Sequence, residues 1–491
     1  MKFTDFEKLA FQYNLIPVYE VITADLLTPV LAYLKIRERD SHCFLLESVE
    51  GKEVLGRYSF IGKDPKKFFF NYGKCLTVSE NGQETVLKEN LFDYIRREIN
   101  LRRSPVLDEL PFFTGGLVGY IGYENISLIE NVIAPGEYEC ENPDSILGFY
   151  ETLVAFDHYK NQIILITNVS VDGNTNLESA YKQAKEKLSE LRQELASTVN
   201  YRSDFSLTGK VESNIDADEF NELVLESKKR IAEGDIFQIV LSRRFSSGYE
   251  GDLLNVYRAL RILNPSPYMY FLEFGDRLTV IGTSPENLVK VKNYVVETMP
   301  IAGTRKRGKT PEEDRELESE LVNDPKERAE HVMLLDLGRN DLGRVCRYNS
   351  INAVQQMSVQ RYSHVMHMVS RVEGRLDDGK DCVDALQACF PAGTVTGAPK
   401  IKAMQLIKGY EKQSRNVYAG AIGHIDFSGN LDMCIAIRTL FAGKNRIHWQ
   451  AGAGIVADSI PELEEMEIRN KSEVLCSALQ YAGGIDEDTC S

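Results

Sequence analysis

Short apolar runs separated by glycine turns dominate the stretch from residue 42 to residue 87. The runs CFLLESVEG, RYSFIG, KFFFNYG and KCLTVSENG each have the length of one strand and end at a turn residue. Residues 145–168 hold two more runs, SILGFYETLVAF and NQIILITNVS, with a break at 158–161 that predicts a hairpin. Residues 177–195 then predict a long charged helix.

The second half of the chain opens with a helical pattern, ADEFNELVLESKKRIAEG, which strand-like runs follow. Helices are expected at 312–322, 325–338, 380–389 and 399–408, and final strands near 416–427, 431–441 and 446–451. Hairpin-type breaks separate most strand runs, which predicts antiparallel neighbours. Because strands and helices are segregated and do not alternate strictly, the predicted fold class is α+β.

Length and a polar stretch predict two domains. A chain of 491 residues exceeds one typical hydrophobic core. Residues 196–214, which include STVNYRSD, are polar and are expected to link an amino-terminal domain at 1–195 to a second domain at 215–485.

Composition limits the class of protein and its location. A hydrophobic content of 43% rules against disorder, and a net charge of −16 argues against a nucleic-acid or membrane surface. The nine cysteines are scattered without a C-x-x-C pair, which indicates reduced thiols. The segment MKFTDFEKLA has acids where a signal peptide needs an apolar run, and no stretch reaches 18 apolar residues. We therefore expect a cytoplasmic protein with no nucleic-acid or membrane partner.

Two pairs of glutamates are spaced three residues apart in predicted helices. Glu327 and Glu330 form one pair, and Glu464 and Glu467 form the other, so each pair lies on one helix face. Four carboxylates on two helix faces could hold one hard divalent cation together with water and a substrate oxygen. The alternative is that the pairs are solvated faces and that Glu327 belongs to a capping box after Asp324.

Two glycine-rich loops resemble nucleotide motifs only in part. Gly452-Ala-Gly454-Ile-Val-Ala457 follows a strand but lacks the βαβ unit of a dinucleotide fold, and PAGTVTGAPK at 391–400 lacks the Walker Lys-Ser/Thr. Both loops could present backbone N–H groups to a carboxylate beside Lys400 or Arg438, or they could be simple turns. His364 and His367 have no third soft ligand nearby, so a structural role is favoured over zinc.

Six motifs occur together between residues 215 and 480. They are PIAGT (300–304), KERAEHVMLLDLGRNDLGRV (326–345), HVMH (364–367), PAGTVTGAPK (391–400), YAGAIG (418–423) and GAGIVADS (452–459). In this order they resemble the chorismate-utilising enzymes, and among them anthranilate synthase component I. The resemblance extends to the amino-terminal half. It implies a two-domain fold of largely antiparallel sheets packed together, with helices on the outside.

The resemblance also implies a metal site and a substrate. Glu330 and Glu467 are similar to direct Mg²⁺ ligands of the family, and Glu327 and Glu464 to residues that hold the waters of the ion. Chorismate is the implied substrate, and Arg can bind a carboxylate bidentately. The implied substrate-binding residues are Gly303, Thr304, Tyr418, Arg438, Gly452, Ala453, Gly454 and Lys471.

The implied reaction adds ammonia at ring C2 while the C4 hydroxyl leaves, and then eliminates pyruvate. Glu286 resembles the general acid for the departing hydroxyl. His367 resembles a histidine near the leaving group, and Thr394 lies beside the ring. Related isochorismate synthases have lysine at the position of Gln238, and aminodeoxychorismate synthases have lysine at the position of Ala302. Both positions favour amination at C2.

Regulation and a partner are implied as well. The segments LLES (45–48) and NPSPYM (264–269) resemble a tryptophan feedback site, although a plain strand and a Pro-set turn are the alternatives. The implied tryptophan-binding residues are Leu46, Glu47, Ser48, Pro265, Ser266, Pro267, Tyr268 and Met269. No G-x-C-x-G nucleophile occurs, so ammonia from glutamine implies a separate glutamine amidotransferase subunit. The alternatives are an aminodeoxychorismate synthase component I and a non-catalytic, tryptophan-sensing binding protein.

Overall fold

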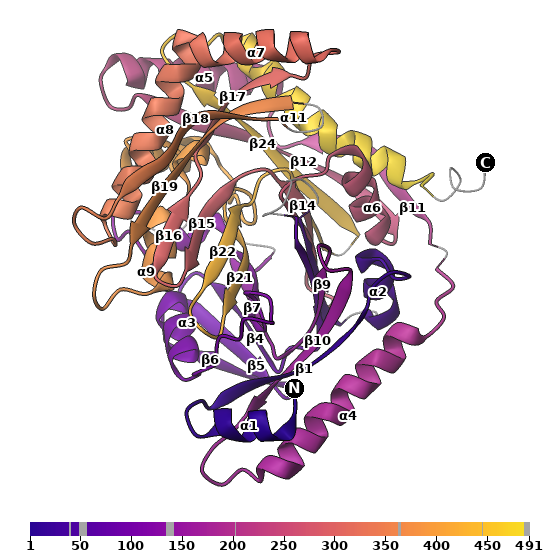
Figure 1. Ribbon diagram of the computed structural model, residues 1–491. Helices are drawn as coiled ribbons and strands as arrows, with labels where there is room; N and C mark the ends of the chain where they lie inside the picture. The colour runs from indigo at the N-terminus through magenta and orange to yellow at the C-terminus, as the bar shows by residue number, and fades with distance from the viewer. Residues whose placement is uncertain are drawn as a thin grey trace.

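The computed structural model describes residues 1–38, 41–48, 56–133, 142–201, 203–361, 365–443 and 445–485. Within them the chain forms two twelve-stranded sheets with antiparallel pairing (Figure 1). The predicted α+β class is therefore confirmed. Across these described segments, none of the helices has the length and apolar character needed to cross a lipid bilayer.

Each sheet combines strands from both halves of the sequence. The first sheet contains β1 (Leu15–Thr23), β2 (His42–Glu47), β3 (Tyr58–Lys63), β9 (Thr152–Asp157), β10 (Gln162–Ser170), β11 (Phe205–Ser213), β12 (Gln238–Gly251), β13 (Tyr268–Phe274), β14 (Thr279–Ser284), β20 (Gly397–Ala398), β23 (Thr439–Gly443) and β24 (Arg446–Ile455). The second contains β4 (Lys67–Tyr72), β5 (Cys75–Glu80), β6 (Gln83–Leu87), β7 (Gly116–Ile121), β8 (Ser145–Tyr150), β15 (Asn287–Lys292), β16 (Val295–Thr298), β17 (Ile301–Lys306), β18 (Asn352–Arg361), β19 (Val365–Arg375), β21 (Ala421–Asp426) and β22 (Leu431–Ile435). The halves meet where β2 pairs with β13 and where β7 pairs with β21.

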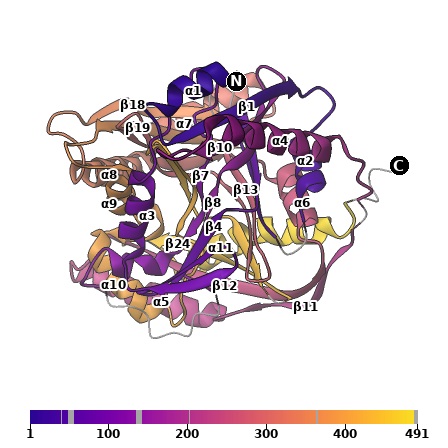
Figure 2. The same cartoon turned by 90° about the horizontal axis from the view of Figure 1, so that it is seen from below.

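The helices cover the outer faces of the two sheets (Figures 1 and 2). They are α1 (Phe3–Ala10), α2 (Pro29–Ile36), α3 (Leu91–Asn100), η1 (Tyr123–Leu128), α4 (Leu177–Ala196), α5 (Ala217–Ala232), α6 (Leu254–Leu263), α7 (Pro311–Asn323), α8 (Pro325–Gly343), α9 (Cys382–Cys389), η2 (Gly393–Val395), α10 (Lys400–Tyr410) and α11 (Pro461–Ala482). One core lies between the first sheet and α4, α5, α6 and α11, and a second between the other sheet and α3, α8 and α9. A third core of aromatic and aliphatic side chains, such as Phe44, Phe70 and Tyr270, fills the space between the sheets.

The polar stretch at 196–214 contains more structure than a plain linker. Its residues Phe205–Ser213 form β11, an edge strand that pairs with β12 and leaves most of its side chains in solvent. An edge strand of this kind needs few apolar side chains, which is why the sequence reads as polar. The division into domains at 1–195 and 215–485 stays a prediction.

Two apolar runs that read as single strands are split between the sheets. The run at 431–441 becomes β22 in the second sheet and β23 in the first, and the run at 145–157 becomes β8 and β9 in the same way. At the first crossing Arg438 has φ +49, a left-handed backbone conformation that is uncommon outside glycine. Arg438, an expected substrate-binding residue, therefore lies where the chain passes from the second sheet to the first.

Candidate active site

The four predicted glutamates come from α8 and α11. Asp324 caps α8, because its carboxylate accepts hydrogen bonds from the backbone N–H groups of Lys326 and Glu327 at 2.9 and 3.2 Å. The Glu327 side chain accepts a hydrogen bond from Arg305 Nη1 at 3.0 Å. Burial raises the pKa of the Glu330 carboxyl, and the charges of Glu327 and Glu467 add to the effect. The two helices thus bring carboxylates within electrostatic reach of one another.

The chemistry of these donors fits a hard cation, although they do not form a complete ligand set. Burial raises the pKa of Glu464, with a further contribution from Glu467, and Glu467 pairs with Lys471 at 2.7 Å. Oxygen donors of this kind suit Mg²⁺ better than softer metals. Among the described residues, no group of three or more His, Cys, Asp or Glu side chains is arranged to hold a metal ion.

The glycine-rich end of β24 forms a tight wall beside the cation Lys471. Lys471 Nζ donates to the carbonyl oxygen of Gly452 at 2.9 Å. A Cβ atom on Gly452 would lie 2.6 Å from the Tyr418 hydroxyl, and one on Gly454 would lie 2.7 Å from Gln238 Nε2. Glycine at these two positions therefore lets Tyr418 and Gln238 approach the strand closely.

A partly buried acid, Glu286, lies next to this wall. Thr394 Oγ1 donates to Glu286 Oε2 at 3.1 Å. Burial raises the pKa of Glu286, while the hydrogen bond from Thr394 and the charges of Lys471 and Arg438 oppose that rise. The structure thus gathers the predicted acid, the predicted ring contact and both predicted cations in one site. A cavity lined by Glu286, Thr394, Pro300 and Leu337, among others, adjoins them.

Gly303 and His367 meet across the β17–β19 ladder, where Thr304 is the register partner of His367. The Nδ1 atom of His367 lies 3.1 Å from the carbonyl oxygen of Gly303, so this nitrogen carries the hydrogen. Gly303 has φ +69, and a Cβ there would meet Leu321 at 2.8 Å and Glu327 at 3.0 Å. His364 lies outside the described residues.

The 391–400 loop holds its cation in an ion pair. The Lys400 ammonium donates to both oxygens of Asp341 at 2.9 and 2.8 Å, and both side chains are mostly buried. A carboxylate cradle at this loop stays a prediction. Asp341 belongs to the RNDLGR segment, and no sequence spacing points to this contact.

Six of the eight predicted tryptophan-binding residues line one cavity between the sheets, away from the glutamates. These six are Leu46, Glu47, Ser48, Pro267, Tyr268 and Met269, and they meet because Met269 is the register partner of Glu47. Pro265 and Ser266 do not belong to the lining. Sequence reasoning missed Lys290 and Asp432, which pair at 2.9 Å and also line the cavity. Lys290 and Asp432 are far apart in the sequence, so no motif or spacing could have pointed to their pairing.

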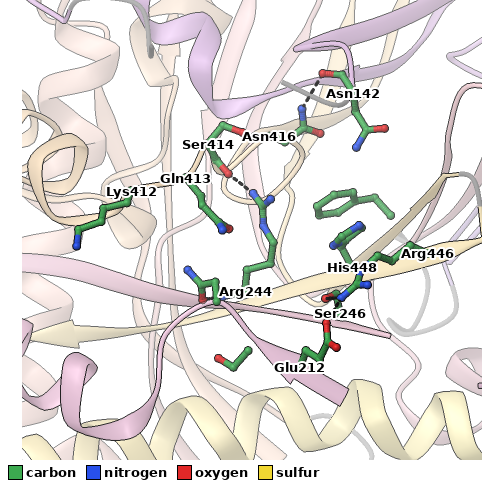
Figure 3. Close-up of a pocket in the computed structure, with 13 residues that line it drawn as sticks. Asn142, Glu212, Arg244, Ser246, Lys412, Gln413, Ser414, Asn416, Arg446 and His448 are labelled. Atoms are coloured by element: carbon green, nitrogen blue, oxygen red, sulfur yellow. Dashed lines mark hydrogen bonds and ion pairs between the residues drawn. The ribbon is translucent and has the colours of Figure 1, made fainter. Parts of the chain in front are cut away.

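A larger polar cavity of about 380 Å³ lies elsewhere and contains none of the predicted site residues (Figure 3). It lies between β11, β12, β23 and β24 and the segment 412–416, which leads from α10 toward Tyr418. Figure 3 shows Arg244 of β12 reaching up to the Ser414 carbonyl oxygen, to which it donates a hydrogen bond. This contact fixes the segment that carries Arg415, a buried residue that the sequence analysis did not single out.

The chain is similar to known proteins over nearly its whole length. Residues 42–477 match the family described as chorismate binding enzyme. Anthranilate synthase component 1 of Acetivibrio thermocellus is 44% identical over 486 residues, covering 97% of this chain and 98% of that protein. The Aquifex aeolicus protein of the same name is 43% identical over 500 residues, covering 98% of each.

Solved structures give the same result. The crystal structure of anthranilate synthase component I from Streptococcus pneumoniae superposes with a TM-score of 0.77 at 37% identity, covering 92% of this chain and 98% of that one. The menaquinone-specific isochorismate synthase of Escherichia coli has a TM-score of 0.71 at 20% identity, covering 97% and 98%, and shares the fold. The chain belongs to the chorismate binding enzyme family, among the anthranilate synthase component 1 proteins.

Proposed function

We propose that the protein is the large subunit of an anthranilate synthase, which converts chorismate and ammonia to anthranilate and pyruvate. The observation that carries this proposal is Glu286, a partly buried carboxyl with a raised pKa. It accepts a hydrogen bond from Thr394 at 3.1 Å, and the charges of Arg438 and Lys471 act on it. An acid whose pKa is raised by burial and two cations therefore share one site. Such a site suits a dianionic substrate whose hydroxyl must be protonated before it leaves.

Arg438, Lys471 and Tyr418 would bind the substrate carboxylates against the glycine wall of β24. Arg offers two parallel donors to one carboxylate, and Lys471 already lies 2.9 Å from the carbonyl oxygen of Gly452. Because Gly452 has no side chain, the Tyr418 hydroxyl can lie directly against β24. We infer that this arrangement orients the ring so that C2 faces Gln238.

Glu330 and Glu467 would hold Mg²⁺ directly, with Glu327 and Glu464 bonding its waters. When bound, the ion would neutralise the acidic side chains and supply positive charge for a substrate carboxylate. The support is the mutual effect of these carboxylates, since Glu327 and Glu467 both raise the pKa of Glu330. Dependence on Mg²⁺ is part of the proposal.

Glu286 would donate its proton to the C4 hydroxyl, which leaves as water while the ammonia lone pair forms the new bond at C2. The added nitrogen then gives up a proton. The C2 hydrogen leaves as a proton, its electron pair completes the aromatic ring as the C3–O bond breaks, and the departing enolate takes up a proton on its methylene carbon to become pyruvate. His367 lies next to Gly303 and would serve this second stage. Gln238 is a neutral amide and cannot deprotonate water, so ammonia is the favoured nucleophile.

The proposal includes an amidotransferase partner, inhibition by tryptophan and a cytoplasmic location. The relatives are named component 1, which supports a second component that supplies ammonia. The cavity lined by Leu46, Ser48 and Met269 supports a regulatory site. The seven described cysteines are free thiols, as expected in a reducing compartment.

A fluorescence assay of this chain alone tests the proposed function. With chorismate, ammonium and Mg²⁺, we expect anthranilate fluorescence, and the Glu286→Gln variant should lose at least about a hundredfold in kcat. A 4-amino product would move the protein to the aminodeoxychorismate branch. Binding of tryptophan without turnover would instead indicate a sensing protein.

A further inference from the structure

Arg415 lies in the segment between α10 and Tyr418 and is buried, with 1% of its side chain exposed. It forms a side-on pair with Glu411, four residues earlier in the sequence, in which Nε and Nη2 each lie 2.7 Å from a carboxylate oxygen. A buried ion pair is often replaceable by apolar side chains without loss of stability. Its role must therefore be sought in what else the guanidinium holds.

The remaining donors of Arg415 bind two main-chain carbonyl oxygens. Nη1 donates to Val395 at 2.7 Å, and Nη2 donates to Val240 at 2.8 Å. Val395 directly follows Thr394 in η2, and Val240 lies two residues beyond Gln238 in β12. The backbone N–H of Val240 also bonds the carbonyl oxygen of Thr396 at 2.8 Å, so the loop and the strand are tied at adjacent points.

The Arg415 guanidinium also packs against two tyrosine rings, one of which belongs to the site residue Tyr418. Its carbon lies 5.7 Å from the centre of the Tyr418 ring and 4.8 Å from that of Tyr123. The backbone N–H of Arg415 donates to Glu124 Oε1 at 2.6 Å, and Ser414 is held by Arg244 as drawn in Figure 3. Arg415 can therefore shift little in either direction.

Glu411 extends the attachment further along β12. One of its oxygens accepts hydrogen bonds from the backbone N–H and the hydroxyl of Ser242, at 2.9 and 2.7 Å. Ser242 is the register partner of Gly452, the residue whose missing side chain makes room for Tyr418. The Arg415–Glu411 pair therefore contacts three segments of the candidate site: η2, β12 and the segment that carries Tyr418.

We propose that the Arg415–Glu411 pair is the positioning element that fixes Thr394, Gln238 and Tyr418 relative to one another. It does not touch the substrate. It acts through Val395, because the carbonyl bond there sets the direction from which the Thr394 hydroxyl meets Glu286. This inference rests on the proposed function.

Arg415→Lys is the test, since lysine keeps the charge beside Glu411 but cannot span both carbonyl oxygens. We expect kcat for anthranilate formation to fall about ten- to a hundredfold, the effect of misplacing groups by about 1 Å. The pH at which kcat falls on the alkaline side should move upward, as it should for Thr394→Val. The double variant should lose less than the product of the two single effects, because both act on one contact.

Arg102→Lys is the matched control. Arg102 pairs with Glu98 at the same spacing, at 3.0 Å, and its guanidinium lies 4.5 Å from the Phe149 ring centre. It should lower thermal stability and leave the kinetics and the pH profile unchanged. If Arg415→Lys does not fold, Glu411→Gln replaces it in the comparison of single and double variants with Thr394→Val.

The results separate this inference from the proposed function. A parent chain that forms no anthranilate overturns the proposed function. A parent that does so, while the variants at 415 or 411 combine multiplicatively with Thr394→Val and keep the parental pH profile, overturns the positioning role alone.

Discussion

Removal of the Thr394 hydroxyl should change the acid that we assign to the first step. In the Thr394→Val variant the side chain keeps its shape, but the 3.1 Å hydrogen bond to Glu286 Oε2 is lost. That bond favours the ionised carboxylate and opposes the rise in its pKa caused by burial. The pKa of Glu286 should therefore rise further.

The size of the rise follows from the type of bond. A hydrogen bond to a charged group contributes about 1.5–3 kcal/mol, and about 1.4 kcal/mol corresponds to one pKa unit. The expected rise is thus about one to two units. Because a general acid works only while protonated, the alkaline fall in kcat should move to higher pH by the same amount.

The assay is the initial rate of anthranilate fluorescence across pH, with saturating chorismate and Mg²⁺ and a fixed concentration of free ammonia. Thr396→Val is the control, since its hydroxyl donates to the carbonyl oxygen of Ala392 at 2.8 Å in the same loop. The control should keep the parental midpoint. An unchanged midpoint in Thr394→Val would refute Glu286 as the acid whose ionisation limits turnover.

Three further predictions concern the metal, the regulatory cavity and stability. Glu330→Gln or Glu467→Gln should reduce kcat at least about a hundredfold, and excess chelator should abolish turnover of the parent; full activity in chelator would remove the metal from the account. Ser48→Phe should fill the cavity at LLES and raise the tryptophan concentration for half inhibition by about tenfold or more, with uninhibited turnover retained, whereas unchanged sensitivity would place the site elsewhere. Burial, together with the charge of Asp144, raises the pKa of Glu124 from 4.5 to about 7, so the folded state binds more protons between these values. The free energy of unfolding should therefore fall by up to about 3 kcal/mol as the pH rises from 4.5 to 7, and Glu124→Gln should flatten this slope in denaturant titrations; an equal slope in both proteins would contradict the assignment.

The sequence predicted those features that depend on local spacing. The expected helix at 312–322 is α7 at Pro311–Asn323, and the expected helix at 399–408 is α10 at Lys400–Tyr410. The spacing of three between Glu327 and Glu330 was sufficient to place both on one helix, because helical periodicity is a local property.

Features that depend on tertiary contacts could not be predicted in this way. The apolar run at 431–441 does not reveal that the chain passes from one sheet to the other near Arg438. Most residues of both strands are buried, so both strands are apolar in sequence. Lys400 reads as an anion-binding cation until the fold places Asp341 beside it. Arg415 looks like a surface residue in a polar segment, and only the packed structure puts it beneath Tyr418.

In the proposed reaction this chain adds ammonia, and not water, to chorismate. Incubation with chorismate, Mg²⁺ and ¹⁵N-labelled ammonium, followed by chromatography and mass spectrometry, tests it most directly. We predict a single aromatic product, anthranilate, that carries one ¹⁵N atom and forms together with an equal amount of pyruvate. Without ammonium, we predict unchanged chorismate. Substantial isochorismate from the unmodified chain, with or without ammonium, would show that the chain adds water and would contradict the proposed amination.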